Sequence, residues 1–150
     1  MNIKIREATI NDIDKGLLDV FIEGYRYHQN GRSDIFTNIS DEMLKEKLIR
    51  SFEKLLTLVI INNENIVGYL SYIIKERNIK KLEVDQLVIM EQYRGKGLGK
   101  RLMEEVKNIA IKNNCDRIEL NCWLFNENAL AMYEHIGFDR QRIIYELKLK

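Results

Sequence analysis

The sequence predicts a single α/β domain with a mixed, mainly antiparallel sheet flanked by helices. Strand-like and helix-like segments alternate in the order β-α-α-β-β-β-α-β-α-β, a short polar turn joins two strands directly, and no linker interrupts the 150 residues. Helices and strands mixed in this way pack in layers, and a direct hairpin excludes an all-parallel sheet. A chain of this length usually forms one domain, so residues 1–150 are expected to fold as one unit.

The composition is that of a globular protein, with 45% apolar and 31% charged residues and a formal net charge of +1. This balance gives no indication of a nucleic-acid partner. No apolar stretch approaches the roughly 20 residues that cross a bilayer, and charges interrupt the N-terminal residues where a signal peptide would be apolar. We therefore expect a soluble, cytoplasmic protein without a membrane partner. Two cysteines and two histidines lie too far apart in sequence to predict a metal site.

The first third of the chain predicts one strand and two helices. Alternation over residues 3–6 indicates a strand, and Thr9 or Asn11 is a suitable N-cap for a helix that reaches about Tyr27. A loop over residues 29–34 follows. Ser40 then caps a second helix, Asp41 to Lys54.

The middle of the chain predicts three strands. Strands 56–61 and 66–74 are joined by Asn62-Asn63-Glu64-Asn65, which is typical of a hairpin turn. A longer strand, 81–90, changes its apolar phase near Asp85-Gln86, and such a change indicates a β-bulge.

The last third predicts two helices and two strands. Apolar residues at helical spacing indicate helices over 97–113 and 126–135, and Gly137 suits the C-terminal cap of the second. Strands are expected at 117–123 and 142–148, with one further short strand at Phe138.

A glycine-rich turn between the strand 81–90 and the helix 97–113 carries the clearest chemical signal. Glycines at positions 95, 97 and 99 let the backbone approach a ligand, and basic side chains flank them at Arg94, Lys96, Lys100 and Arg101. The first amides of a helix have no intrahelical acceptor and carry the positive end of its dipole. The turn is therefore expected to hold a pyrophosphate.

Two common phosphate-binding motifs fit this turn poorly. A Walker A loop needs Ser or Thr after its lysine, whereas Arg101 follows Lys100. A dinucleotide-binding fingerprint needs G-x-G-x-x-G in an early βα unit, whereas this chain has G-x-G-x-G after a hairpin. A nucleotide-binding module is consequently a weak alternative.

The turn resembles a third motif. Gln92-Tyr-Arg-Gly95-Lys-Gly97 is similar to the Gln/Arg-x-x-Gly-x-Gly/Ala signature of the GCN5-related N-acetyltransferases (GNAT). The stretch from Asn126 through Tyr133 to Gly137-Phe138 resembles a second block of that family, at the expected separation. Glu91 stands where the family often has proline. The resemblance covers residues 55–150 well, and the N-terminal third matches only in the order of its elements.

This resemblance implies acetyl-CoA as the acyl donor and direct acetyl transfer to a primary amine. It implies that Tyr133 is the general acid and that Asn126 and the strand 87–89 contact the pantetheine arm, although periodicity alone would place Tyr133 in the core. The residues that it assigns to the cofactor are Leu87, Val88, Ile89, Gln92, Arg94, Gly95, Lys96, Gly97, Leu98, Gly99, Lys100, Asn126 and Tyr133.

The general base and the acceptor are left open. Asp85 is the first candidate for the base, followed by His28 and Glu119, and each is equally consistent with an ordinary structural role. Aromatic and acidic side chains suit a cationic amine. A small-molecule amine is expected because no long acidic groove is evident in the sequence. A non-catalytic acyl-CoA sensor and a protein or peptide amine are the alternatives, and family habit makes a homodimer an expectation. The candidate acceptor residues are Tyr25, His28, Asp34 and Trp123.

Overall fold

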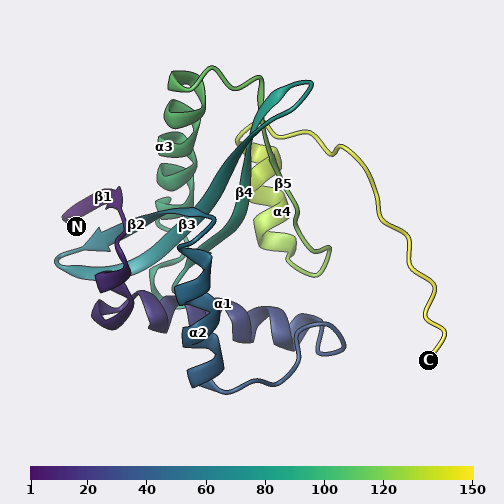
Figure 1. Cartoon of the computed structure of the whole chain (residues 1–150), viewed down its shortest axis with the longest axis horizontal. Helices are drawn as coiled ribbons and strands as arrows, with labels where there is room; N and C mark the ends of the chain where they lie inside the picture. The colour runs from purple at the N-terminus through teal and green to yellow at the C-terminus, as the bar shows by residue number, and fades with distance from the viewer.

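The computed structural model describes all 150 residues and contains one five-stranded sheet in the order β1-β2-β3-β4-β5 (Figure 1). Strands β1 to β4 pair antiparallel, whereas β5 runs parallel to β4. The expected mixed, mainly antiparallel sheet is thus confirmed. The strands are β1 (Ile3–Glu7), β2 (Leu56–Asn62), β3 (Asn65–Glu76), β4 (Lys80–Ile89) and β5 (Arg117–Leu120).

Helices cover both faces of this sheet and enclose two apolar clusters. One cluster packs α3 against β2, β3 and β4, and includes Leu70, Leu82 and Leu102. The other packs η1, α1 and α2 against the opposite face, and includes Leu17 and Tyr69. None of the helices has the length and apolar character that a membrane crossing needs. The helices are η1 (Ile10–Lys15), α1 (Leu17–Gly31), α2 (Asp41–Ser51), η2 (Glu91–Tyr93), α3 (Leu98–Lys112) and α4 (Glu127–His135).

The first helical region is two elements rather than the one expected. Gly16 has φ of +118°, and this left-handed conformation ends η1 before α1 begins. Asp12 fixes the start of η1, because its carboxylate accepts from the Thr9 N–H at 2.8 Å and from both Arg6 guanidinium nitrogens at 2.8 and 2.9 Å. The N-terminal strand is thereby tied to the helices that follow it.

The expected hairpin and bulge are both present. β2 and β3 are joined by a two-residue turn in which Asn63 and Glu64 have positive φ, as the right-handed twist of a hairpin favours. In the β3–β4 pair, Ser71 lies opposite Gln86 and Tyr72 opposite Val84, so Asp85 is the extra residue of a bulge.

The C-terminal segment differs from the prediction. Residues 138–150 form no strand, so neither the strand 142–148 nor the short strand at Phe138 is present. The segment instead extends away from the body of the molecule (Figure 1). Its alternating pattern reflects a local preference for extended backbone, but a strand also needs a neighbour to pair with. β5 also ends early, at Leu120 rather than Trp123.

Candidate active site

β4 and β5 separate along the sheet. They pair only from Lys81–Val84 to Arg117–Leu120, whereas β4 continues to Ile89. Asp85, the bulged residue, follows the last paired position directly. The edge of β4 over residues 85–89, which includes Leu87, Val88 and Ile89, therefore has no β5 neighbour. An unpaired strand edge of this kind can accept an extended ligand through its backbone.

The glycine-rich turn lies at the end of this open edge. Gly95 and Gly97 both have φ of +76°, and a Cβ built on either would meet no atom within 4 Å. Gly97 is the N-cap of α3, and the backbone N–H groups of residues 95–100 make no hydrogen bond in the structure. The turn thus presents a row of free donors in open space at a helix N-terminus, which is the arrangement that binds phosphate groups.

Buried contacts hold the turn in position. The Leu98 side chain is buried in the α3 cluster, and its backbone N–H is one of those that make no hydrogen bond. Gly99 lets α4 approach closely, since a Cβ there would lie 3.1 Å from the Met132 sulfur. On the other side, the Glu23 carboxylate of α1 accepts from the Glu91 N–H at 2.9 Å, which anchors the residues that precede the turn.

The basic side chains of the turn lie around it in different ways. Arg94 donates from Nε to the Ile89 carbonyl at 2.9 Å, and its guanidinium lies 5.4 Å from the centre of the Tyr27 ring. Lys96 lies over the Tyr93 ring, whereas Gln92 and Lys100 are exposed. Arg94 therefore lies at the end of the unpaired β4 edge, and Lys96 and Lys100 add positive charge beside the glycine-rich turn.

Tyr133 lies on α4 and is partly buried against the α3 cluster, and Asn126 is the N-cap of the same helix. Burial raises the pKa of Tyr133 above its ordinary value, and the nearby Cys122 adds to that increase. The Tyr133 hydroxyl makes no hydrogen bond in the structure. Asn126 caps α4 by accepting from the Ala129 N–H, and its side-chain oxygen also accepts from the Tyr27 hydroxyl at 3.2 Å. The Asn126 amide nitrogen makes no bond to the rest of the chain.

The two carboxylates considered as bases lie in opposite environments. Desolvation raises the pKa of Asp85, and a hydrogen bond with Ser71 opposes part of that increase, although the side chain keeps solvent exposure. Glu119 accepts from Lys81 Nζ at 2.8 Å and from Gln141 at 3.0 Å, and these bonds lower its pKa. A carboxylate that is already engaged by a lysine is a weak proton acceptor, so Asp85 is the better candidate.

Two of the predicted acceptor residues, His28 and Trp123, belong to one aromatic cluster. Phe36 contacts both, with ring centroids 5.3 Å from His28 and 5.8 Å from Trp123, and Phe125 packs on both as well. Tyr27 joins the cluster through His28 and Phe125. The cluster thus combines the end of α1, the loop after it and the connection from β5 to α4.

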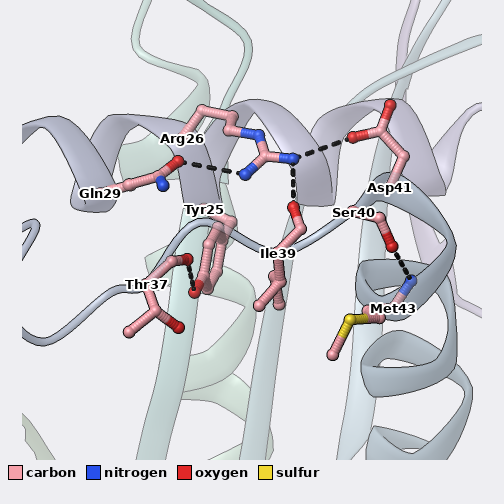
Figure 2. Close-up of polar contacts among 8 residues, drawn as sticks. All are labelled: Tyr25, Arg26, Gln29, Thr37, Ile39, Ser40, Asp41 and Met43. Carbon is pink, nitrogen blue, oxygen red and sulfur yellow. Dashed lines mark hydrogen bonds and ion pairs between the residues drawn. The ribbon is translucent and has the colours of Figure 1, made fainter.

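The other two predicted acceptor residues have their polar groups engaged. Tyr25 donates to the Thr37 carbonyl at 2.8 Å, and Arg26 binds Gln29, the Ile39 carbonyl and Asp41 (Figure 2). These bonds fix the loop between α1 and α2 against α1. Asp34 forms two hydrogen bonds with Arg32, whose guanidinium lies 5.0 Å from the centre of the Trp123 ring. Tyr25 and Asp34 therefore shape this region rather than offer free groups.

Glu23, which anchors the residues before the turn, was not among the predicted site residues. It is adjacent in α1 to Gly24, where a Cβ would collide with Val88, and a Cβ at Gly31 would collide with Phe125. Two glycines seven residues apart inside a helix indicate close approach of a neighbour along one face. That spacing was the signal in the sequence that could have located this part of α1.

The fold and the site together combine an unpaired strand edge with a glycine-rich turn at a helix N-terminus. Comparison with known families identifies the class of protein. Residues 22–138 match the acetyltransferase (GNAT) family, and the chain belongs to this family. The family expected from the glycine-rich turn is thereby confirmed.

The names of curated relatives include N-acetyltransferases for several kinds of amine. The chain is 22% identical to N-alpha-acetyltransferase 30 of Xenopus laevis over 95% of its own length, but it spans only 56% of that protein. It is 24% identical to glucosamine 6-phosphate N-acetyltransferase 1 of Dictyostelium discoideum, over 94% of this chain and 87% of the relative. A segment covering 37% of each chain is 36% identical to the spermine/spermidine N(1)-acetyltransferase of Bacillus subtilis.

Solved structures share the fold over nearly the whole chain. A tetramutant of a Bacillus halodurans protein superposes with a TM-score of 0.85 at 25% identity, covering 97% of this chain and 99% of that one. Glucosamine-6-phosphate N-acetyltransferase from Arabidopsis thaliana superposes with a TM-score of 0.68 at 23% identity, over the full length of both chains. The expected fold is confirmed by both.

Proposed function

We propose that this chain is an enzyme that transfers the acetyl group of acetyl-CoA directly to a primary amine of a small molecule. The observation that carries the proposal is the row of free N–H donors over residues 95–100 at the end of the unpaired β4 edge. The expected cytoplasmic location, drawn from the charged N-terminal residues, stays a prediction.

The residues present fit acetyl-CoA in two respects. The open space in front of Gly95 and Gly97 suits a pyrophosphate on the free N–H groups, and Lys96 and Lys100 would balance its charge. The edge from Leu87 to Ile89 would pair with the amides of the pantetheine arm, with Asn126 facing it from α4. Because Arg94 Nε now donates to the Ile89 carbonyl, that side chain would turn toward the phosphates when this edge is occupied.

Tyr133 is proposed as the proton donor. In the reaction a bond forms between the amine nitrogen and the acetyl carbon, the bond from that carbon to sulfur breaks, the nitrogen loses a proton to water, and the departing thiolate takes a proton. A tyrosine hydroxyl is protonated at neutral pH, and burial raises the pKa of Tyr133 further, so it is present as a donor to the sulfur and is reprotonated from water afterwards. A backbone N–H at Leu87 or Val88 would stabilise the charge on the thioester oxygen, which typically contributes a few kcal/mol.

Asp85 is proposed as the general base, which accepts a proton from the ammonium group of the acceptor and so leaves a neutral amine. It lies at the point where β4 leaves β5, and desolvation raises its pKa toward the range in which a carboxylate accepts protons readily. Glu119 is less suited because Lys81 holds it as an ion pair.

The aromatic cluster supports a small, cationic acceptor. The guanidinium groups of Arg94 and Arg32 already lie over the rings of Tyr27 and Trp123, so these aromatic rings suit a cation, while the nearby Asp34 is paired with Arg32. An acceptor ammonium group would take the place of one of these groups or lie against Phe36. The loop after α1 is tied down by hydrogen bonds (Figure 2), which favours a compact acceptor over a polypeptide laid across it.

The acceptor class is tested by incubating the protein and acetyl-CoA with three pools: polyamines and amino sugars, peptides with free N-termini, and peptides with an internal lysine and a blocked N-terminus. Acetylated products are identified by mass spectrometry. Acetylation of the first pool in preference to both peptide pools supports a small-molecule acceptor. Acetylation confined to peptides would overturn that part of the proposal, and binding of acetyl-CoA with no product from any pool would favour an acyl-CoA sensor.

A further inference from the structure

β3 carries a buried tyrosine whose hydroxyl group has a single hydrogen-bond partner. Tyr69 is 2% exposed and packs in the cluster between α1 and the sheet. Its hydroxyl bonds to the side-chain amide of Gln86 on β4 and to no other group. A buried O–H without an acceptor is costly, so the Tyr69 hydroxyl donates and Gln86 Oε1 accepts. This bond fixes the orientation of the Gln86 amide.

The nitrogen of this amide is left free. Gln86 Nε2 carries two N–H donors and makes no hydrogen bond within the chain. Asn62 Oδ1, at the β2–β3 hairpin, is the one buried side-chain nitrogen or oxygen that lacks a partner, so Gln86 Nε2 is not enclosed. Because Oε1 and Nε2 are attached to the same planar carbon, the bond to Tyr69 also limits the directions in which these N–H groups point.

Gln86 lies on the part of β4 that borders the candidate acceptor region. It is two residues from Val88, so both side chains lie on the face of β4 that α1 covers, where a Cβ at Gly24 would come within 2.8 Å of Val88. β5 pairs with β4 only as far as Val84, and the chain then leaves β4 toward the aromatic cluster. Gln86 is therefore located between α1 and the departing chain, next in sequence to Asp85.

Asp85 and Gln86 together present complementary groups. Burial raises the pKa of Tyr69, and the charge of Asp85 adds to that increase, so this carboxylate lies near the same hydroxyl. When ionised, Asp85 offers only hydrogen-bond acceptors, which suit the N–H groups of an ammonium ion. Gln86 Nε2 offers only donors, which suit an oxygen with a free lone pair. A ligand that meets both groups thus carries an ammonium group and an accepting oxygen close to it.

We propose that Gln86 is a specificity-determining residue and that the acceptor is an amine with a hydroxyl or carbonyl oxygen close to its amino group, such as an amino alcohol or an amino sugar. Tyr69 is the positioning residue that holds the amide in place. The inference rests on the proposed function, since it requires acetyl transfer to an amine beside Asp85. An alkyl polyamine, which carries only methylene and ammonium groups at neutral pH, would leave the Gln86 N–H groups covered and unpaired.

The acceptor preference is tested with propanolamine, butylamine and diaminopropane. They share three methylene groups and a primary amine, and they differ only in a terminal hydroxyl, methyl or ammonium group. The kcat/KM for propanolamine should exceed that for each of the others by about tenfold or more, because only its oxygen pairs with the Gln86 N–H groups. Glucosamine should exceed spermidine in the same direction.

The variant Gln86→Glu inverts the outward group and keeps the bond to Tyr69. One carboxylate oxygen accepts from the hydroxyl, and the other replaces two donors by an acceptor. The ratio of kcat/KM for diaminopropane to that for propanolamine should rise by about tenfold or more. Both acceptors are measured on the same variant, so a common effect on Asp85 cancels in the ratio. The control Gln29→Glu makes the same change on α1, where Gln29 accepts from Arg26 (Figure 2), and should keep the wild-type ratio.

The double variant Tyr69→Phe, Gln86→Met removes the hydrogen bond without leaving either partner unpaired. Apolar groups of similar shape replace both partners, so the circular dichroism spectrum and melting temperature should stay close to those of the wild type. Its kcat/KM for propanolamine and butylamine should agree within about threefold, since no donor is left to distinguish them. A wild-type preference retained in this variant and in Gln86→Glu would overturn the inference.

The wild-type protein separates failure of this inference from failure of the proposed function. Turnover of all three amines at similar kcat/KM would overturn the inference alone, because acetyl transfer would still occur without recognition of an oxygen. No turnover of any amine by a protein that binds acetyl-CoA would overturn the proposed function and this inference with it.

Discussion

At the scale of single residues, the environment of each side chain decides its chemistry more than its type does. Asp85 and Glu119 are both carboxylates near the point where β4 and β5 part, yet desolvation raises the pKa of the first and Lys81 lowers that of the second. The sequence supplied both residues as candidates for the base. It could not separate them, because Lys81 and Glu119 are 38 residues apart in sequence and meet only when β4 pairs with β5.

The proposed role of Tyr133 predicts a specific kinetic defect. Removing its hydroxyl in Tyr133→Phe should lower kcat by about 100-fold or more, because the departing thiolate loses its proton donor. The KM for acetyl-CoA and the melting temperature should change little, since this hydroxyl makes no hydrogen bond within the chain. Steady-state kinetics checks this, with the exposed Tyr145→Phe as the matched control. A kcat within threefold of the wild type would remove Tyr133 from the mechanism.

The ion pair between the half-exposed Arg6 and the buried Asp12 predicts a loss of stability in acid. The Arg6 guanidinium and the Thr9 N–H hold the pKa of Asp12 at about 2, against an unfolded value near 3.8. A lowered pKa stabilises the fold above pH 4, and this contribution of about 2 kcal/mol is lost as the pH falls from about 4 to about 2.

Urea unfolding of Asp12→Asn at several pH values checks this prediction. The variant should be less stable than the wild type at pH 7, and the difference should shrink below pH 4. Asp14→Asn is the control, because Asp14 forms only an exposed pair with Lys45 and its loss should cost no more than about 0.5 kcal/mol. An equal effect of both variants would contradict the assignment.

At the scale of elements, short sequence patterns predicted the turns and the bulge, because neighbouring residues determine these structures. The hairpin turn at Asn63-Glu64, the bulge at Asp85 and the glycine-rich turn at 95–99 were all placed from short stretches of sequence. The break at Gly16 was missed, because one glycine inside an apolar period is compatible with a continuous helix. The strand expected at 142–148 was wrong, since strand formation depends on a neighbouring strand and alternation does not identify one.

For the glycine-rich turn, we expect that replacing Gly97 by alanine lowers the affinity for acetyl-CoA more than it lowers the stability of the fold. In Gly97→Ala the positive φ should cost about 1–2 kcal/mol of stability. The added Cβ would also enter the open space in front of the free N–H groups, so affinity for acetyl-CoA should fall at least tenfold.

Gly137→Ala supplies a matched control for that variant. Gly137 also has a positive φ, and a Cβ there also meets nothing within 4 Å, but it lies past the end of α4 and away from the turn. Calorimetric titration with acetyl-CoA should therefore give near wild-type affinity for Gly137→Ala at a similar loss of stability. Equal loss of affinity in the two variants would mean that strain, rather than the turn, is responsible.

At the scale of the whole molecule, the unpaired β4 edge and the glycine-rich turn are proposed to form one binding site, so a ligand that fills both should stabilise the fold. A ligand at 100 times its Kd adds about 2.7 kcal/mol to the free energy of unfolding if it binds only the native state. Thermal unfolding should therefore shift upward with CoA and acetyl-CoA. ATP and NAD should shift it less, because neither has a pantetheine arm to pair with the β4 edge. A larger shift with ATP or NAD would favour a nucleotide-binding module instead.

The measurement that tests the central claim most directly is amine-dependent release of CoA from acetyl-CoA by the wild-type protein. At least one small amine is expected to accelerate CoA release well above the rate without amine, and an acetylated amine should form in equal amount. If acetyl-CoA fails to bind at all, then the assignment of residues 95–100 and of the open β4 edge to acetyl-CoA is contradicted.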